Sequence, residues 1–500
     1  MAPAGVPPVP ESGVDTSTKK KSKRIVVIAA ITALALIVVG GGVAMAGNYF
    51  GWFRGPQPSA ALPAGAVGYA QFDADPSADQ KLGAMSFLRD VKQVSTSGGN
   101  SDVKQMIWDA LTEQYSYAFE DIDYQADIKP WVGNRIGAAV YPATGNGSTT
   151  SAVAIQVTNE DLAKTKIPQL FDGAVLLGFK DGFAVITSEG FKDDLSAKFG
   201  KSSLADDGLF SSDFRSLGDP GWAAVWGDSK RMADLVGTYS TVSTASYAAA
   251  GRFAATLRFT NDTVQLKAVG FGLDPTSIPN TSAQSDVGGL PATTAAVVSV
   301  KGGGAIFKSA WKKYLDSMKS AGYNPEDVLS QEGWRMPDDV VTLLGEQTTV
   351  AMSNDGLTDA VNGNINYYDG GVPEIGARVT SSNPTAVKSL VDRLVNNSSY
   401  SSNINQDVRG NAYIVASTSS YLDALANGGG GLGALPKFTK VVPNWQNAAM
   451  VGYLDLAPLS SKLTQGSAEY SQFLGSLQAV GITSTYNQDT TESTIILSRS

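Results

Sequence analysis

Histidine and cysteine are both absent from the 500 residues of this chain. Their absence excludes a Ser-His-Asp or Cys-His nucleophile, a thiol redox pair and a zinc site made of imidazole or thiolate ligands. Carboxylates, lysine, tyrosine and hydroxyl groups are what remains for chemistry. The lack of cysteine is also compatible with an exported protein that contains no disulfide bonds.

Charged residues are scarce and unevenly distributed along the chain. They make up 17% of the sequence against 43% apolar residues, so the chain can form more than one hydrophobic core. The first 46 residues carry five lysines or arginines and two acidic residues, whereas the whole chain has a net charge of −9. The remainder is therefore strongly acidic, which disfavours nucleic acid and anionic lipid headgroups as partners.

Residues 25–46 form an uncharged apolar run of 22 residues. At about 1.5 Å per residue, a helix of this length crosses a hydrocarbon core of roughly 30 Å. Basic residues precede the run and aromatic residues follow it, and both are typical of the membrane interface. The predicted interface residues are Lys20, Lys21, Lys23, Arg24, Tyr49, Phe50, Trp52 and Phe53.

The basic side of this helix predicts the orientation of the protein. Positive charges stay in the cytoplasm, so residues 1–24, rich in Pro, Ser and Thr, form a disordered cytoplasmic tail. Residues 47–61 form a linker, and the rest of the chain is extracytoplasmic. A cleaved signal peptide is the alternative, because Ala44-Met45-Ala46 has the form of a cleavage site. Both interpretations export the same body from the cell.

The exported part contains the same order of signals twice. LPAGAVGYAQFD begins at Leu62 and LPATTAAVVSVK at Leu290, and each is followed by a helical stretch and then a strand pattern. Asp127 and Asp339 align at an offset of 212 residues, and Val157 aligns with Val379 further on. We therefore predict a tandem duplication with one unit at 62–281 and a second at 290–500.

Each unit is predicted to be α+β, with a mainly antiparallel sheet and helices packed on it. Short alternating runs such as SAVAIQVT and FAVITS are typical of half-buried strands, and LAKTKIPQL and PTAVKSLVDRLV have helical spacing. LRFTNDTVQL has a turn at Asn261-Asp262 and reads as a hairpin. Direct hairpins imply antiparallel pairing.

Two carboxylates, Asp73 and Asp75, follow the first strand of the first unit in DADPSAD. Paired carboxylates are the acid and base of glycoside cleavage. The second unit has KGGGAI at this place and no carboxylate, so a surface turn is the alternative.

The other polar motifs point to no cofactor or metal. FEDIDYQAD has Ala126 and Val132 where a calcium loop of the EF-hand type needs Gly and Glu. KGGGA lacks the terminal Gly-Lys-Ser/Thr of a phosphate-binding loop. We also expect Asp127 to cap a short helix that ends at Gly133, and most tryptophans to lie in the core.

The basic tail, the single membrane helix, the Leu-Pro-Ala strand and the DIKPWVGNRIGAAV segment resemble the bacterial domain-of-unknown-function family 3352, which is common in actinobacteria. The resemblance covers about residues 57–500, although the second unit has Leu343 where the first has Trp131. It implies an envelope location. It implies no activity and no functional residue.

These observations favour a membrane-anchored extracytoplasmic protein that is a non-enzymatic binding or structural module of the cell envelope. Its expected partners are the lipid bilayer, through the N-terminal helix, and an envelope protein or glycan. Two alternatives remain open at this point. One is a carboxylate-based envelope hydrolase or transferase centred on Asp73 and Asp75, and the other is a carrier of lipid or another apolar ligand.

Overall fold

A computed structural model describes most of the chain from residue 55 onward. The described residues are 55–88, 104, 105, 108, 109, 112, 122–143, 149–171, 173–236, 251–273, 284–362, 373–396, 405–427, 431–463, 471–487 and 489–500. The predicted tail, membrane helix and interface residues from Lys20 to Phe53 lie outside them. Among the helices described, none is long and apolar enough to span a bilayer.

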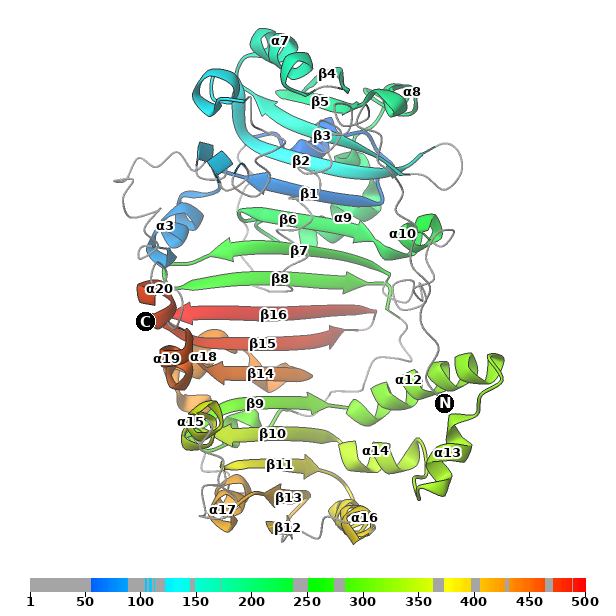
Figure 1. The fold of residues 1–500 in the computed structure, drawn as a ribbon, viewed down its shortest axis with the longest axis vertical. Helices are drawn as coiled ribbons and strands as arrows, with labels where there is room; N and C mark the ends of the chain where they lie inside the picture. Colours follow the sequence, from blue (N-terminus) through cyan, green and yellow to red (C-terminus); the bar gives the residue numbers. More distant parts are fainter. Residues whose placement is uncertain are drawn as a thin grey trace, which may run out of the picture.

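The described strands form one sheet of 16 strands, which Figure 1 shows as a single stack. The order across the sheet is β12-β13-β11-β10-β9-β14-β15-β16-β8-β7-β6-β1-β2-β3-β5-β4. The strands are β1 (Gly68–Asp73), β2 (Val132–Pro142), β3 (Thr149–Val157), β4 (Ala174–Lys180), β5 (Phe183–Ser188), β6 (Ala223–Asp228), β7 (Arg252–Phe259), β8 (Thr263–Phe271), β9 (Thr294–Lys301), β10 (Gln347–Ser353), β11 (Ile375–Thr380), β12 (Asn405–Arg409), β13 (Ala412–Ala416), β14 (Met450–Asp455), β15 (Leu477–Asn487) and β16 (Thr490–Arg499).

Every pair of neighbouring strands in this sheet is antiparallel, as the sequence predicts. The strands of both halves join in one sheet through the central pair β8 and β16. Outward from β8 come β7, β6, β1, β2, β3, β5 and β4. Outward from β16 come β15, β14, β9, β10, β11, β13 and β12, which is the same order with each number raised by eight.

Hairpin turns explain much of this pairing. The predicted turn at Asn261-Asp262 joins β7 to β8, and the N–H of Thr260 donates to the carbonyl oxygen of Thr263 across it (2.8 Å). β4 and β5 are joined by Asp181-Gly182, both with positive φ (52° and 81°). Such a two-residue turn has the twist that a hairpin needs.

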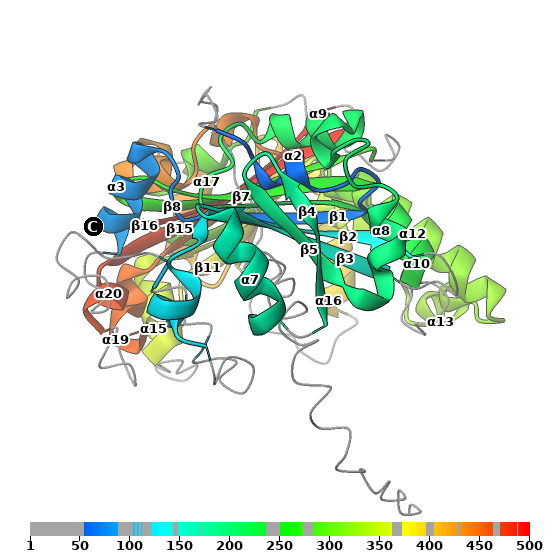
Figure 2. The ribbon, with the colours of Figure 1, turned by 90° about the horizontal axis from the view of Figure 1, so that it is seen from above.

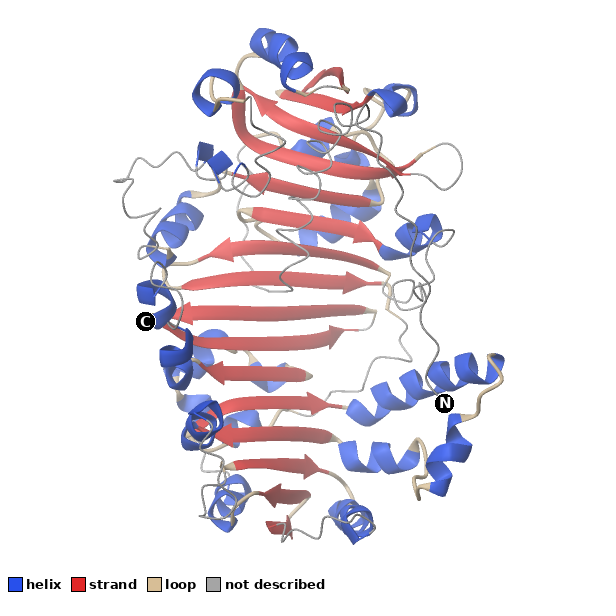
Figure 3. Cartoon of the chain, in the orientation of Figure 1, coloured by secondary structure: helices blue, strands red, loops and turns tan. Residues whose placement is uncertain are grey.

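Helices lie on both faces and at the ends of the strands (Figure 3). The helices of the first half are α2 (Pro58–Ala61), α3 (Ala78–Phe87), the π-turn η2 (Tyr124–Ile128), α7 (Glu160–Leu170), η3 (Glu189–Phe191), α8 (Lys192–Ser196), η4 (Leu204–Asp206), α9 (Gly208–Ser216) and α10 (Ser229–Val236). Those of the second half are η6 (Val287–Gly289), α12 (Gly303–Ser320), α13 (Pro325–Gln331), α14 (Asp338–Leu344), α15 (Asn354–Asn362), α16 (Pro384–Asn396), α17 (Ser419–Asn427), η7 (Leu432–Ala434), α18 (Pro436–Val441), η8 (Trp445–Asn447), η9 (Ala457–Leu459), α19 (Ser460–Leu463) and α20 (Ser471–Gly475).

The two faces of the sheet differ in how they are covered. On the first, which we call the covered face, α2 and α9 pack over the first half and α17 and α18 over the second. These helices and the strands form the two largest apolar clusters, around Phe210 and Phe438. On the other, which we call the open face, α7 and α16 pack over opposite ends of the sheet and leave the middle strands in view (Figures 1 and 2).

The cap predicted at Asp127 is wrong. Asp123 caps the π-turn η2, because its carboxylate accepts the N–H of Ala126 (2.7 Å), and Asp127 lies inside the turn. Gly133 does not end this turn with a positive φ but belongs to β2. Both Asp123 and Asp127 could come directly before the first residue of this short helix, and the sequence alone does not distinguish the two positions.

Candidate functional site

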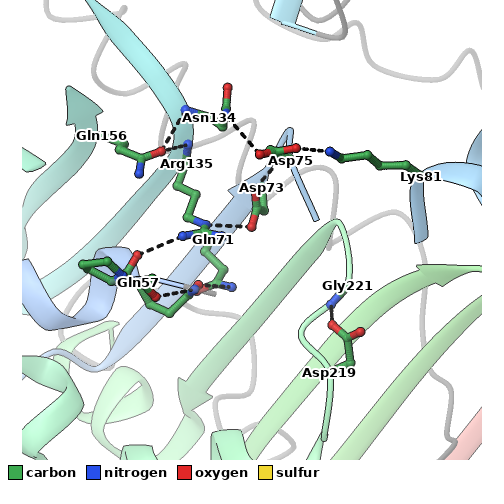
Figure 4. A network of polar contacts seen from close by, with 12 residues as sticks. Gln57, Gln71, Asp73, Asp75, Lys81, Asn134, Arg135, Gln156, Asp219 and Gly221 are labelled. Carbon is green, nitrogen blue, oxygen red and sulfur yellow. Dashed lines mark hydrogen bonds and ion pairs between the residues drawn. The ribbon is translucent and has the colours of Figure 1, made fainter. Parts of the chain in front are cut away.

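Asp73, the first predicted candidate, ends β1 and is paired with Arg135 on β2 (Figure 4). The Nε of Arg135 donates to Oδ2 of Asp73 (2.7 Å), and the two side chains are 12% and 10% exposed. Oδ1 of Asp73 accepts the backbone N–H of Asp75 (2.8 Å). This bond from an Asp side chain to the N–H two residues on is an Asx turn.

Asp75 lies beside Asp73 but is held by other groups. Its carboxylate accepts from Nδ2 of Asn134 (3.3 Å) and forms an ion pair with Lys81 on α3. Gln156 on β3 supports the same corner, since its Oε1 accepts the N–H groups of Asn134 and Arg135 (2.9 and 3.2 Å). The structure therefore brings both predicted carboxylates together, in a network that joins β1, β2, β3 and α3.

The second half has different chemistry at the matching place. Lys301 ends β9 and pairs with Gln347 of β10 in the ladder, as Asp73 pairs with Arg135. Lys301 is buried, and burial lowers the pKa of its ammonium group. Nε2 of Gln347 donates to Oδ1 of Asp286 and to Oγ of Ser299 (2.6 and 2.8 Å).

Asp127 and Asp339, which the sequence comparison aligns, each bond to a helix of the open face. Asp127 is bonded to Nζ of Lys166 on α7 (2.6 Å), and Asp339 to Nη2 of Arg393 on α16 (2.5 Å). Each also accepts the backbone N–H four residues earlier. These two aspartates tie α7 to η2 and α16 to α14, the elements that precede β2 and β10.

The same contacts change the acidity of both carboxyl groups. The hydrogen bond from Lys166 lowers the pKa of Asp127, with help from the N–H of Asp123. Burial alone would raise the pKa of Asp339, but the N–H of Arg335 and the guanidinium of Arg393 hold it below its ordinary value. Both carboxylates are therefore stabilised in the charged form that pairs with the helix.

The predicted acidic cluster forms no metal centre in the described structure. Glu120 and Asp121 lie outside the described residues, and Asp123 and Asp127 are used as a cap and an ion pair. Across the described ranges no group of three acidic, histidine or cysteine residues is arranged to hold a metal ion. Of the tryptophans predicted to lie in the core, Trp131, Trp222 and Trp226 are buried, and those at 108, 311, 334 and 445 are half-buried.

Arg252, Arg258 and Lys267 of the middle strands point to the covered face, whereas Arg499 at the end of β16 lies on the other side, in line with Ile495 and Leu497. Lys267 on β8 is paired with Glu492 on β16 (2.8 Å). On β7, Arg252 bonds Asp213 of α9 through both carboxylate oxygens (2.6 and 3.2 Å), and Arg258 donates to backbone carbonyl groups beneath the helices. The side that the helices cover thus holds these three cations and the carboxylates paired with Lys267 and Arg252.

The open face of the same strands is apolar. Because side chains alternate along a strand, the neighbours of Lys267 point the other way. The alternate positions from β8 to β10, which we call the apolar floor, are Val264, Leu266, Ala268, Leu497, Ile495, Val480, Ile482, Leu454, Met450, Ala296, Val298, Val300, Val350 and Met352. Val298 is 52% exposed and Val350 42% exposed.

Several polar side chains within and beside the apolar floor bond to groups close to them. Ser484 and Ser493 lie across from one another and share a hydrogen bond (3.0 Å). Arg499 lies at the margin, where its Nη1 donates to the carbonyl oxygen of Phe87 on α3 (2.6 Å). The apolar floor was missed in the sequence, although the alternation in TVQLKAVGF, with Lys267 between apolar neighbours, is a signal of it.

Comparisons with known proteins add no family. No family model matches the chain, and no curated protein matches it. Two crystal forms of TP0453, forms IV and III, match with TM-scores of 0.24 and 0.23 at 10% and 9% identity. Each covers 43% of this chain, and 81% and 79% of the TP0453 chain. Scores this low carry no argument about fold or function, so the resemblance to family 3352 stays a prediction.

Proposed function

We propose that this chain is a membrane-tethered, extracytoplasmic binding module of the cell envelope with no enzymatic activity. The observation that carries the proposal is the apolar floor, on a sheet where Lys267, Glu492 and Arg252 point to the covered side and Arg499 lies only at the margin of the floor. A contiguous exposed apolar surface on a folded domain marks an interaction site. Charged side chains lie under the helices and apolar side chains face outward. A partner would therefore bind to the open face.

The tether in this proposal is the apolar segment 25–46. Basic residues on one side of it and aromatic residues on the other support a single-pass anchor with a cytoplasmic N-terminus. The acidic charge of the exported part supports a partner other than nucleic acid. Membership of family 3352 is part of the same proposal.

The absence of enzymatic activity is supported by the Asp73 and Asp75 network. A general acid and base need carboxylates that can reach a substrate and change protonation. Asp73 is tied to Arg135 and to a backbone N–H, and Asp75 is paired with Lys81. This network favours the turn over the carboxylate-based hydrolase.

We also propose that the two halves arose by tandem duplication. The shared strand order supports it, and so does the register of the strands. Gly68 pairs with Val140 and Gly227, and Ala296, 228 residues after Gly68, pairs with Met352 and Leu454, which lie 212 and 227 residues after those partners. Insertions between strands explain why the offsets differ.

Helix caps support the duplication in the outer strands. Asn159 accepts the N–H of Leu162 at the start of α7, and Asn383 accepts the N–H of Ala386 at the start of α16. These caps are 224 residues apart. Val157 and Val379 are 222 residues apart, so the caps favour a match two residues away from the one in the sequence comparison.

A photo-crosslinking side chain at Val298 tests the binding role in cells. The control is the same side chain at Leu209, which is 50% exposed on α9 and on the other side of the sheet. We expect an adduct, whether with lipid or protein, at position 298 and not at 209. Equal labelling at both positions, or none at 298, would refute the proposed function.

Orientation is tested separately, because the chain contains no native cysteine. A single cysteine replacing Leu209 should react in intact cells with a maleimide that does not cross membranes. One replacing Ser12 should react only after the membrane is opened. The reverse pattern would refute the extracytoplasmic location.

A further inference from the structure

We infer that the apolar floor binds the acyl chains of membrane lipid, an inference that rests on the binding role proposed above. The first argument is the absence of charge. Of the described positions that form the floor, none carries an ionisable side chain, while Lys267 and Glu492 between them point to the covered face. A glycan or charged peptide would lose its hydration there without gaining partners, whereas an acyl chain loses none.

The second argument is the shape of the open face. α7 and α16 stand on this face at opposite ends of the sheet (Figures 1 and 2), tied to η2 and α14 by Asp127 and Asp339. A helix with its side chains is about 10–12 Å thick. Two sheets packed face to face are only about 10 Å apart. The helices therefore hold off the sheet of a second copy, while a layer of acyl chains fits between them.

The third argument concerns the side on which an apolar ligand has room. Beneath the covering helices the space is filled by side chains, among them the buried rings of Phe210, Trp226 and Phe438. An apolar ligand between helices and sheet would have to displace them. The apolar floor needs no such displacement, because Val298 and Val350 are exposed as they stand.

The fourth argument is the reach of the tether. The described chain begins at Gly55, and residues 47–54 separate it from the predicted membrane segment. Eight extended residues at roughly 3.5 Å each span about 28 Å. The start of the described chain at Gly55 therefore stays within about one bilayer thickness of the lipid from which acyl chains would come.

The test uses the full chain in phosphatidylcholine vesicles, with one introduced cysteine carrying a fluorophore. The labelled positions are Val298→Cys on the apolar floor and Leu209→Cys on α9 as the matched control. Bromine on the lipid acyl chains quenches a fluorophore only in contact. We expect brominated lipid to remove most of the emission at position 298 and to leave position 209 unchanged.

Other outcomes overturn the inference in distinguishable ways. A label at 298 that resists bromine and also resists aqueous iodide is covered by protein, either residues 25–46 or another partner. That result would exclude lipid as the ligand of the apolar floor but would leave the proposed binding role standing. Spin labels at 298 that couple between two molecules would show a second copy as the occupant. A label quenched by iodide but not by bromine shows a bare face and removes both proposals.

A charge variant separates lipid binding from general damage to the fold. Val298→Glu with Val350→Glu puts two carboxylates at exposed positions of the floor, with the fluorophore at Ile482→Cys. We expect loss of bromine quenching with an unchanged circular dichroism spectrum. Val298→Ala with Val350→Ala should keep the quenching. Retained quenching in the glutamate variant would overturn the inference.

Discussion

Ion pairs between the covering helices and the sheet stabilise this protein, and the pair of Asp213 with Arg252 is an example. Asp213 on α9 has a side chain that is 3% exposed and accepts three hydrogen bonds, two from Arg252 and one from Nε1 of Trp226 (2.9 Å). A buried carboxylate that is fully bonded costs much more to remove than a surface one. The covered face therefore depends on Asp213 in a way that the many surface carboxylates do not share.

Asp213→Ala should destabilise the fold by about 3–5 kcal/mol, because Arg252 loses its buried partner. Urea unfolding followed by tryptophan fluorescence measures the change. The control is Asp161→Ala on α7, whose exposed ion pair with Lys164 should change stability by no more than about 0.5 kcal/mol. Similar losses in the two variants would contradict the role of Asp213.

Asp339→Asn should destabilise the fold by about 1–3 kcal/mol at pH 7, since the amide is a poorer partner for Arg393. The pKa of Asp339 is lower in the folded state, so its stabilising effect is present above the ordinary value and is lost as the pH falls through the folded pKa. The difference between wild type and variant should therefore begin to shrink near the ordinary value of about 4 and be lost only below the folded pKa. Thermal unfolding at pH 7 and pH 3 measures it. A difference independent of pH would show that the charge is unimportant.

Among the elements, those with local signals could be predicted from the sequence. The alternation and the turn at Asn261-Asp262 predict β7 and β8, and the helical spacing predicts α7 and α16. β4 was missed, because AVLLGFK does not alternate and its strongest signal is the Asp181-Gly182 turn that follows it. Helices and strands that are specified by neighbouring residues can be predicted from the sequence. The other elements with which they pack cannot.

The position of helix α18 over strand β15 depends on one small residue, Gly481. A Cβ at Gly481 would meet the carbonyl oxygen of Val441 on α18 at 2.1 Å, whereas one at Gly452 on the neighbouring strand would meet Ile482 at 3.4 Å. Gly481→Ala should cost about 1–3 kcal/mol by forcing α18 away from the sheet. Gly452→Ala should be nearly neutral. Chemical denaturation of both variants checks this, and equal stabilities would contradict the close approach.

At the scale of the whole molecule, the sequence shows which residues share a face but not which face is covered. Alternation separates Lys267 from Leu266 and Ala268, yet a lysine in a strand ordinarily indicates the side in water. Here helices from distant parts of the chain, α9 and α18, cover the lysine side. The pairing of Asp73 with Arg135, 62 residues apart, was hidden for the same reason.

The single sheet also depends on contacts far apart in sequence. β8 and β16 are neighbours in the sheet although they lie more than 200 residues apart in the sequence. In this pair Lys267 lies opposite Thr494. These two residues are 227 apart, as are Phe259 and Tyr486 in the flanking hairpins. Under the proposed duplication, the two halves meet across a two-fold axis between Lys267 and Thr494. Each half alone would expose the strand that the other half pairs.

Separate halves, residues 55–281 and 284–500, should therefore differ in self-association. Two copies of 284–500 can pair β16 with β16, with Thr494 opposite Thr494. Two copies of 55–281 would set Lys267 against Lys267 without Glu492, and like charges in such a buried place cost several kcal/mol. Sedimentation velocity should show dimers of 284–500, at least about tenfold weaker association of 55–281, and recovery in its Lys267→Thr variant. Equally strong dimers of 55–281 with Lys267 intact would refute the two-fold arrangement.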